Sequence, residues 1–214
     1  MSGTSMCLKK RIKLSLFPFA LIPFLSAAQP VSLPVNSIDS GKVTANKGKL
    51  TLLGNSVKLG DQAPNFKAAN NKFSPISLND FQGKAVLIST VPSLDTGICS
   101  LQTKHFNDKI ATKYPNVVML TVSMDLPFAQ SRFCKSENIT QLYTLSDAVW
   151  REFASKYGLL IQDMGLLARS VLILDESHRI IYKQLVPNLA KEPDYISVEA
   201  ALKKMQDTKS ESQK

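Results

Sequence analysis

Three cysteines carry the most reactive side chains of this 214-residue sequence: Cys7, Cys99 and Cys134. Cys99 and Cys134 could form a static disulfide, which is common in exported proteins, or a redox pair in which one sulfur reacts as a thiolate. No two cysteines form a C-x-x-C pair, which argues against a thioredoxin-type dithiol site and against a zinc knuckle. With only His105 and His178 available, no metal-ligand cluster stands out, and the sequence predicts neither a metal nor a cofactor.

Cys99 follows an apolar, β-branched run at residues 85–91, which is typical of a strand buried on both faces. It lies in the first turn of a predicted helix at residues 98–114, where backbone N–H groups lack partners and the helix dipole is positive. Both effects favour the thiolate, which is the reactive form of cysteine. Thr96 can place a hydroxyl beside this sulfur, although Thr96 and Asp95 are also residue types that cap helix N-termini.

The residues that precede Cys99 form a recognisable motif. Pro92, Thr96 and Cys99 fit the pattern P-x-x-x-[T/S]-x-x-C, which is the active-site motif of the peroxiredoxins. The longer run at residues 91–99 resembles the thiol peroxidase branch of that family, the atypical two-cysteine peroxiredoxins. By itself the short pattern is of moderate specificity, because it fixes only three positions.

A second motif lies further along the chain. Residues 125–134, which end at Cys134, closely resemble the segment that carries the resolving cysteine of the same branch. Because two long motifs occur in register, the chain is identified as a member of this branch over about residues 49–205, and the resemblance implies a thioredoxin-like fold. Shorter matches lie at residues 60–66, 80–84, 168–169 and 192–195.

The resemblance implies a role for five residues. Cys99 would attack the terminal oxygen of a hydroperoxide and become a sulfenic acid, and Cys134 would condense with it to an intramolecular disulfide. Thr96 would hydrogen-bond the thiolate and the peroxide, and Pro92 would shield the site from water. Arg169 would stabilise negative charge as the O–O bond breaks. On residue type and position alone, Arg169 could equally form an ordinary surface ion pair.

The same resemblance implies the partners of the reaction. The substrates would be hydrogen peroxide and organic hydroperoxides, and thioredoxin or an exported thioredoxin-like protein would reduce the disulfide. A homodimer is also implied. The alternative, from a different class of protein, is a non-catalytic exported thioredoxin-fold binding domain in which Cys99 and Cys134 form a permanent structural disulfide.

Basic residues outnumber acidic ones, 26 against 17, and the formal net charge is +9. Four basic residues cluster at residues 9–13, and the others are scattered without a basic stripe or interleaved aromatic residues, so we expect no nucleic-acid partner. The cluster precedes an apolar stretch at residues 14–25 and the small residues Ser26 and Ala28. This order is typical of a secretory signal peptide, here cleaved before Gln29.

The apolar stretch is too short for a permanent membrane anchor, which needs roughly 20 residues. The sequence therefore predicts export to the bacterial periplasm with no membrane anchor after cleavage, or a cytoplasmic protein if the segment is not a functional signal. The predicted organisation is a signal peptide at 1–28, an extended leader or linker at 29–48, a peroxiredoxin domain at 49–206 and a polar tail at 207–214.

The order of the predicted elements indicates an α/β fold. A hairpin around Gly54 and Asn55 is expected to pair residues 50–53 with residues 57–59. Strands then alternate with helices before two antiparallel strands and a last helix, which predicts a central mixed sheet flanked by helices. The predicted strands are residues 85–91, 117–122, 142–145, 171–174 and 180–185, and the predicted helices are residues 98–114, 129–137, 150–156 and 195–205.

Overall fold

The computed structural model describes residues 39–45 and 48–212, so the predicted signal peptide and its cleavage site lie outside the described residues. The strands are β1 (Asp39–Ala45), β2 (Gly48–Leu53), β3 (Lys67–Ala69), β4 (Pro75–Ser77), β5 (Val86–Thr90), β6 (Val118–Ser123), β7 (Tyr143–Ser146), β8 (Leu160–Ile161), β9 (Ser170–Leu174) and β10 (Ile180–Leu185). The helices are α1 (Gly97–His105), α2 (Ala111–Lys113), α3 (Pro127–Ser136), α4 (Glu152–Tyr157) and α5 (Tyr195–Ser212), with a 3₁₀ turn at Leu78–Phe81 and a π-helical segment at Phe106–Ile110.

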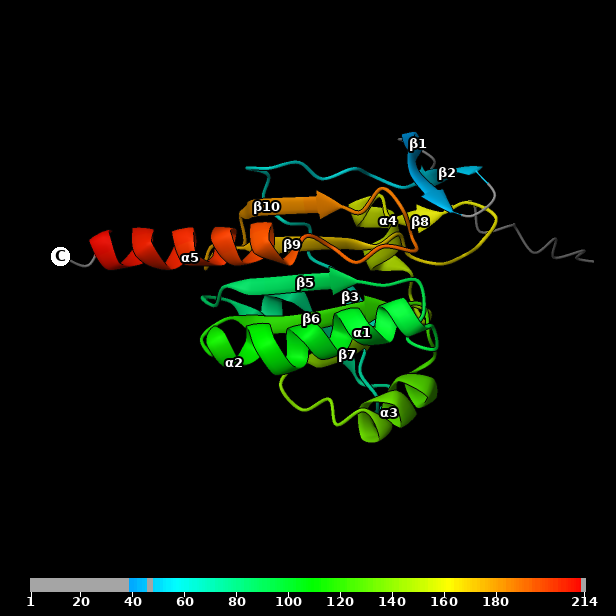
Figure 1. Cartoon of the computed structure of the whole chain (residues 1–214), viewed down its shortest axis with the longest axis horizontal. Coiled ribbons are helices and arrows are strands. Elements are labelled where there is room, and N and C mark those ends of the chain that lie inside the picture. The colour runs from blue at the N-terminus through cyan, green and yellow to red at the C-terminus, as the bar shows by residue number, and fades with distance from the viewer. Residues whose placement is uncertain (1–38, 46–47, 213–214) are drawn as a thin grey trace, which may run out of the picture. The chain divides into compact units, whose positions relative to one another are not determined.

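The larger of two sheets has the strand order β10-β9-β5-β6-β7-β3-β4 (Figure 1). Its centre is parallel, because β5, β6 and β7 run in the same direction, whereas β9 and β10 on one side and β3 and β4 on the other are antiparallel to their neighbours. This arrangement is the central mixed sheet that the sequence predicts.

The strand β5 is buried along its whole length, as its unbroken apolar run predicts. Val86 and Ile88 pack into the core on one face of the sheet, and Leu87 packs into the core on the other face. This alternation follows the two-residue period of a strand. With both faces packed in this way, β5 is held in the sheet, and the loop that leads to Cys99 begins at its end.

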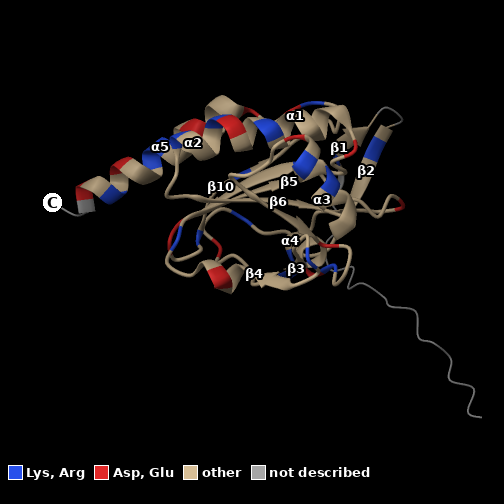
Figure 2. Ribbon diagram, turned by 90° about the horizontal axis from the view of Figure 1, so that it is seen from below, with Lys and Arg blue, Asp and Glu red and all other residues tan. Residues whose placement is uncertain are grey.

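Helices cover both faces of this sheet, with α1, α2 and α5 on one side and α4 on the other (Figure 2). The first layer packs through Phe106, Ile110, Val198 and Leu202. The second packs through Phe153 and Tyr157, whose rings stack with centroids 4.3 Å apart. Helix α3 lies beside β7, the strand next to β6 (Figure 1).

The N-terminal hairpin is present, but the predicted pairing of its strands is wrong. β2 pairs with β1, which lies inside the range predicted as a leader, and residues 57–59 form no strand. Gly54 ends β2 because its backbone lies against α4: a Cβ at this position would be 2.3 Å from the carbonyl oxygen of Ser155, whose oxygen also accepts the N–H of Asn55 at 2.7 Å. Gly54 therefore serves a close helix contact and not a hairpin turn.

The hairpin also contacts the segment that follows β10. The N–H of Thr44 donates to the carbonyl of Pro187 at 2.7 Å, and the N–H of Leu189 donates to the carbonyl of Thr44 at 3.0 Å. These backbone bonds fix the position of Leu189, whose carbonyl accepts a hydrogen bond from Arg169.

The predicted last helix, residues 195–205, ends too early, because α5 continues to Ser212 and so extends into the polar segment that begins at residue 207. Acidic and basic residues are interspersed along the later turns of α5 (Figure 2). The helix therefore extends beyond the turns that make apolar contacts with the sheet. Its last turns are held by an ion pair between Lys209 and Glu176 and by side-chain bonds to the helix backbone, such as that from Thr208 Oγ1 to the carbonyl of Lys204 at 3.0 Å.

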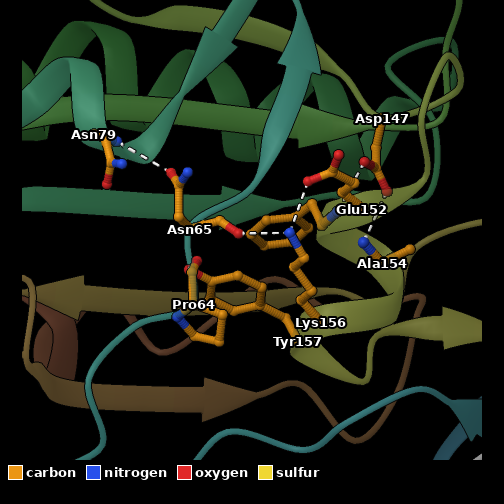
Figure 3. A network of polar contacts seen from close by, with 9 residues as sticks. Pro64, Asn65, Asn79, Asp147, Glu152, Ala154, Lys156 and Tyr157 are labelled. Atoms are coloured by element: carbon orange, nitrogen blue, oxygen red, sulfur yellow. Dashed lines mark hydrogen bonds and ion pairs between the residues drawn. The ribbon is translucent and has the colours of Figure 1, made fainter.

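The chain segment before β3 is fastened to α4 by polar contacts (Figure 3). Tyr157 Oη donates to the carbonyl of Pro64 at 2.8 Å, and Lys156 Nζ donates to the carbonyl of Asn65 at 2.9 Å. Asp147, which follows β7, accepts the N–H groups of Phe153 and Ala154 at 3.0 and 2.8 Å and so caps α4. Because this carboxylate is fully buried, desolvation raises its pKa to about 6.

None of the helices among the described residues is both long and apolar enough to cross a membrane. The mixed sheet, the two helical layers and the N-terminal hairpin confirm the predicted α/β class.

Candidate active site

Arg169 and Cys99 form the centre of the site. Nη2 of Arg169 lies 3.3 Å from Sγ of Cys99, and the two side chains are 1% and 0% exposed. The same Nη2 donates to the carbonyl of Leu189 at 2.9 Å. Among the described residues no carboxylate forms an ion pair with this guanidinium, so the buried cation lacks a fixed counter-charge. Sγ of Cys99 is thus a side-chain atom in direct contact with this charge, and a thiolate there would supply the counter-charge.

The strand order explains how two residues 70 positions apart meet. β9 runs antiparallel to β5 with Ser170 opposite Thr90, and Thr90 Oγ1 donates to the carbonyl of Ala168 at 2.6 Å. Arg169 thus enters β9 beside the end of β5, where the chain turns toward α1. Cys99 lies in the first turn of α1, as predicted. The alternative of a surface ion pair for Arg169 is wrong because its side chain is buried.

Gln102 is a site residue that the sequence analysis did not identify. Its Oε1 accepts the Nη1 group of Arg169 at 2.6 Å, and its Nε2 donates to Ser89 Oγ at 2.7 Å. The side chain is fully buried and lies three residues after Cys99, so both point from α1 toward the sheet. That helical spacing from a reactive cysteine is the signal that could have found it.

The loop between β5 and α1 places Pro92 and Thr96. Pro92 is buried directly after β5. Thr96 is exposed and occupies the N-cap position of α1, but its side chain makes no capping bond: its hydroxyl donates to the carbonyl of Ser93 at 3.0 Å. No hydrogen bond joins Thr96 to Cys99, so the structure does not bring this hydroxyl onto the sulfur.

Cys134 lies in α3, and its sulfur is 3.2 Å from Oγ1 of Thr144 in β7. Burial raises the pKa of the Cys134 thiol, and the bond with Thr144 partly offsets that rise. Both Cys99 and Cys134 are free thiols, and both contact one small apolar cluster that includes Phe133. The structure therefore holds the two predicted redox cysteines near each other without a bond between them.

A groove of about 380 Å³ lies between the start of α1 and α3. Thr96 and Ser100 line it on one side and Arg132 and Phe133 on the other. A larger cavity of about 500 Å³ is lined by residues 55–57, 61, 62, 64, 65 and 156 and contains none of the site residues. Among the described residues no cluster of three or more His, Cys, Asp or Glu side chains could hold a metal ion.

Comparison with known proteins identifies the class to which this fold and site belong. The Redoxin family profile matches residues 58–202, and the chain therefore belongs to the Redoxin family. It is 38% identical to a peroxiredoxin-like protein from Aquifex aeolicus whose crystal structure superimposes with a TM-score of 0.72, covering 78% of this chain and 98% of that one.

Relatives with a named activity are similar over most of their length. The thiol peroxidase of Oceanobacillus iheyensis is 44% identical over 162 residues, which is 76% of this chain and 98% of the relative. The thiol peroxidase of Bacillus subtilis is 42% identical over 154 residues, 72% of this chain and 92% of the relative. These relatives confirm the expectation of a thiol-dependent peroxidase of the peroxiredoxin class. The alternative of a non-catalytic domain with a structural disulfide is not favoured.

Proposed function

We propose that this peroxidase reduces hydrogen peroxide and organic hydroperoxides with Cys99 as the nucleophile. The thiolate attacks the terminal oxygen of the hydroperoxide, the S–O bond forms and the O–O bond breaks. The sulfur loses two electrons and becomes a sulfenic acid, and the leaving alkoxide or hydroxide takes a proton and departs as alcohol or water. The observation that carries this proposal is the 3.3 Å contact between Cys99 Sγ and the buried guanidinium of Arg169, which has no carboxylate partner among the described residues.

Arg169 stabilises the reaction in two ways. Its guanidinium stabilises the thiolate before attack, and it faces the negative charge that develops on the leaving oxygen. Gln102 holds one arm of the guanidinium, so the other arm stays directed at the sulfur. Thr96 donates its hydroxyl proton to Ser93 and keeps its lone pairs free, so it can accept the O–H of an incoming hydroperoxide. Pro92 limits the access of water.

Cys134 then resolves the sulfenic acid. Its sulfur attacks Sγ of Cys99, an S–S bond forms, and the sulfenic oxygen leaves as water with the proton of the Cys134 thiol. A dithiol protein of the thioredoxin kind gives two electrons and two protons to this disulfide and becomes oxidised itself. The raised pKa of Cys134 is in keeping with a resolving role, because it lowers the thiolate fraction of Cys134 at neutral pH.

The division of roles is tested by single-turnover experiments with hydrogen peroxide and thioredoxin. We expect Cys99→Ser to abolish peroxide consumption and Cys134→Ser to consume about one equivalent and then accumulate a sulfenic acid that dimedone traps. Peroxide consumption by Cys99→Ser would refute the assignment of the nucleophile. Normal recycling of Cys134→Ser with thioredoxin would refute the assignment of the resolving cysteine.

We also propose that the protein is exported to the periplasm and acts there as a homodimer. Export rests on the basic and apolar segments at residues 9–13 and 14–25, and the homodimer rests on the family resemblance. N-terminal sequencing of protein from a periplasmic fraction should begin at Gln29, and light scattering of the purified protein should give twice the mass of one chain. Retention of Met1 or a monomeric mass would contradict the respective proposal.

A further inference from the structure

Asp125, which follows β6, holds the loop that leads to Cys99. Its Oδ1 accepts the hydroxyl of Ser93 at 2.7 Å, and its Oδ2 accepts the N–H of Leu94 at 2.7 Å and the hydroxyl of Ser123 at 2.8 Å. Three donors thus converge on one carboxylate. Two of them belong to the segment between β5 and α1, so the position of that segment depends on Asp125.

The same junction holds the helix that carries Cys134. Ser123 Oγ, which donates to Asp125, also accepts the Nε2 group of Gln130 at 3.0 Å. Gln130 is fully buried in α3 and lies one helical turn before Cys134. Asp125 and Ser123 therefore connect the two elements that bear the reactive cysteines.

Formation of the disulfide requires both sulfurs to leave their present contacts. A disulfide needs an S–S distance of about 2.0 Å and Cα atoms within about 7 Å. Both sulfurs are free here, and each has another partner: Cys99 contacts Arg169, and Cys134 contacts Thr144. Both sulfurs must leave these partners before the bond can form, and any shift of the loop before Cys99 or of α3 in that step strains the hydrogen bonds at Asp125 and Ser123.

We propose that Asp125 is a positioning residue that sets the balance between the two chemical steps. Its bonds to Ser93, Leu94 and Ser123, here called the Asp125 latch, keep Cys99 beside Arg169 for reaction with peroxide and slow its approach to Cys134. The latch rests on the proposed function, because it concerns the two cysteines that function assigns. A surface ion pair between Lys104 and Glu137 also joins α1 to the end of α3, but exposed pairs of this kind contribute little.

Asp125→Asn tests the latch, because it removes the charge and leaves one acceptor oxygen where the carboxylate offers two to the three donors. We expect the rate constant for oxidation of Cys99 by hydrogen peroxide to fall about fivefold, and the rate of disulfide formation to rise by about the same factor. Both rates are read from acid-quenched, alkylated samples by mass spectrometry. Because the sulfenic acid is then shorter-lived, less sulfinic acid should form in excess peroxide.

Two further variants complete the test. Asp95→Asn removes one negative charge from the loop between β5 and α1, which the latch holds. The Asp95 side chain makes no hydrogen bond among the described residues, so this change should leave both rates within about twofold of wild type. Ser93→Ala removes only one bond of the latch and keeps the carboxylate. Like Asp125→Asn, it should slow the oxidation of Cys99 and speed disulfide formation, but by a smaller factor. If Asp125→Asn lowers the melting temperature severely, Ser93→Ala provides the test instead.

The outcomes separate the latch from a merely structural role. Opposite changes in the two rates support the latch. Two rates that fall together, or that both stay at wild-type values in Asp125→Asn and Ser93→Ala, overturn it while leaving the proposed function intact. A wild-type protein that does not react with hydrogen peroxide would overturn the proposed function and the latch with it.

Discussion

Oε1 of Gln102 lies 2.6 Å from Nη1 of Arg169, while Nη2 of the same guanidinium lies 3.3 Å from Sγ of Cys99. Gln102 and Cys99 are three residues apart in one helix, so α1 carries the thiol and also orients the cation beside it. The geometry of the site is therefore set by one rigid element together with the start of β9.

Gln102→Leu tests how much the hydrogen bond between Gln102 and Arg169 contributes to the reaction of Cys99. The change keeps a side chain of similar size but leaves Nη1 of Arg169 without its partner in a buried site, which costs about 1–3 kcal/mol. We expect the rate constant of Cys99 with hydrogen peroxide to fall about tenfold, measured by single-turnover quenching. Gln206→Leu, on the exposed face of α5, is the matched control. A variant at Gln102 that reacts like wild type would remove this residue from the site.

Arg169→Lys keeps the positive charge but loses the two-armed geometry. A single ammonium cannot reach Gln102, Leu189 and Cys99 together as the guanidinium does. We expect the rate of peroxide reduction to fall by about two orders of magnitude, as when a donor to a developing negative charge is removed. The protein should still fold, which circular dichroism checks. A rate within about threefold of wild type would show that charge alone is sufficient.

Thr144→Val should slow the resolving step. Burial raises the pKa of Cys134, and the bond from Thr144 opposes that rise, so its loss raises the pKa further and leaves less thiolate at neutral pH. We expect disulfide formation at pH 7 to slow about threefold, with the difference shrinking as the pH rises and both proteins ionise. Thr121→Val is the control, because the buried Thr121 hydroxyl has no partner among the described residues. Equal rates at pH 7 would contradict the prediction.

Asp147 gives a pH dependence of stability. Its pKa is raised from 3.8 to about 6 in the folded protein, so the folded state binds the proton more tightly than the unfolded state between these values. The contribution of this group to the free energy of unfolding therefore falls as the pH rises through that window. Between pH 4 and pH 7, the free energy of unfolding of wild type should fall relative to that of Asp147→Asn by roughly 2 kcal/mol. Urea unfolding of both proteins at several pH values measures this difference in the free energy of unfolding. A difference that stays constant with pH would contradict the prediction.

Much of the fold was predictable because its central strands are unbroken apolar runs and its helices follow them in regular order. The hairpin was misplaced because Gly54 fits a turn equally well on sequence alone. Its true role depends on Ser155, a residue about 100 positions away. The end of the last helix is not predictable from its apolar period, because the exposed end of α5 is polar and is held by contacts such as that of Lys209 with Glu176.

For the site, sequence motifs located the reactive residues but not the ones that hold them. Cys99 contacts Arg169 and shares an apolar cluster with Cys134, whereas Thr96 lines the groove and has no hydrogen bond to the sulfur. Gln102 and Asp125 were not identified because their roles depend on partners from other strands and loops. The roles of the Gln102 amide and of the Asp125 carboxylate become recognisable only once the positions of those partners are known.

The backbone hydrogen bonds between Thr44 and the segment after β10 have a practical consequence for anyone preparing the protein. Leu189 donates to Thr44 and accepts from Arg169, so β1 is only one residue removed from the guanidinium. A truncation that begins after Ala45 would remove Thr44 and with it a hydrogen bond that holds Leu189, whose carbonyl accepts from Arg169. Kinetic work should therefore use protein that retains β1.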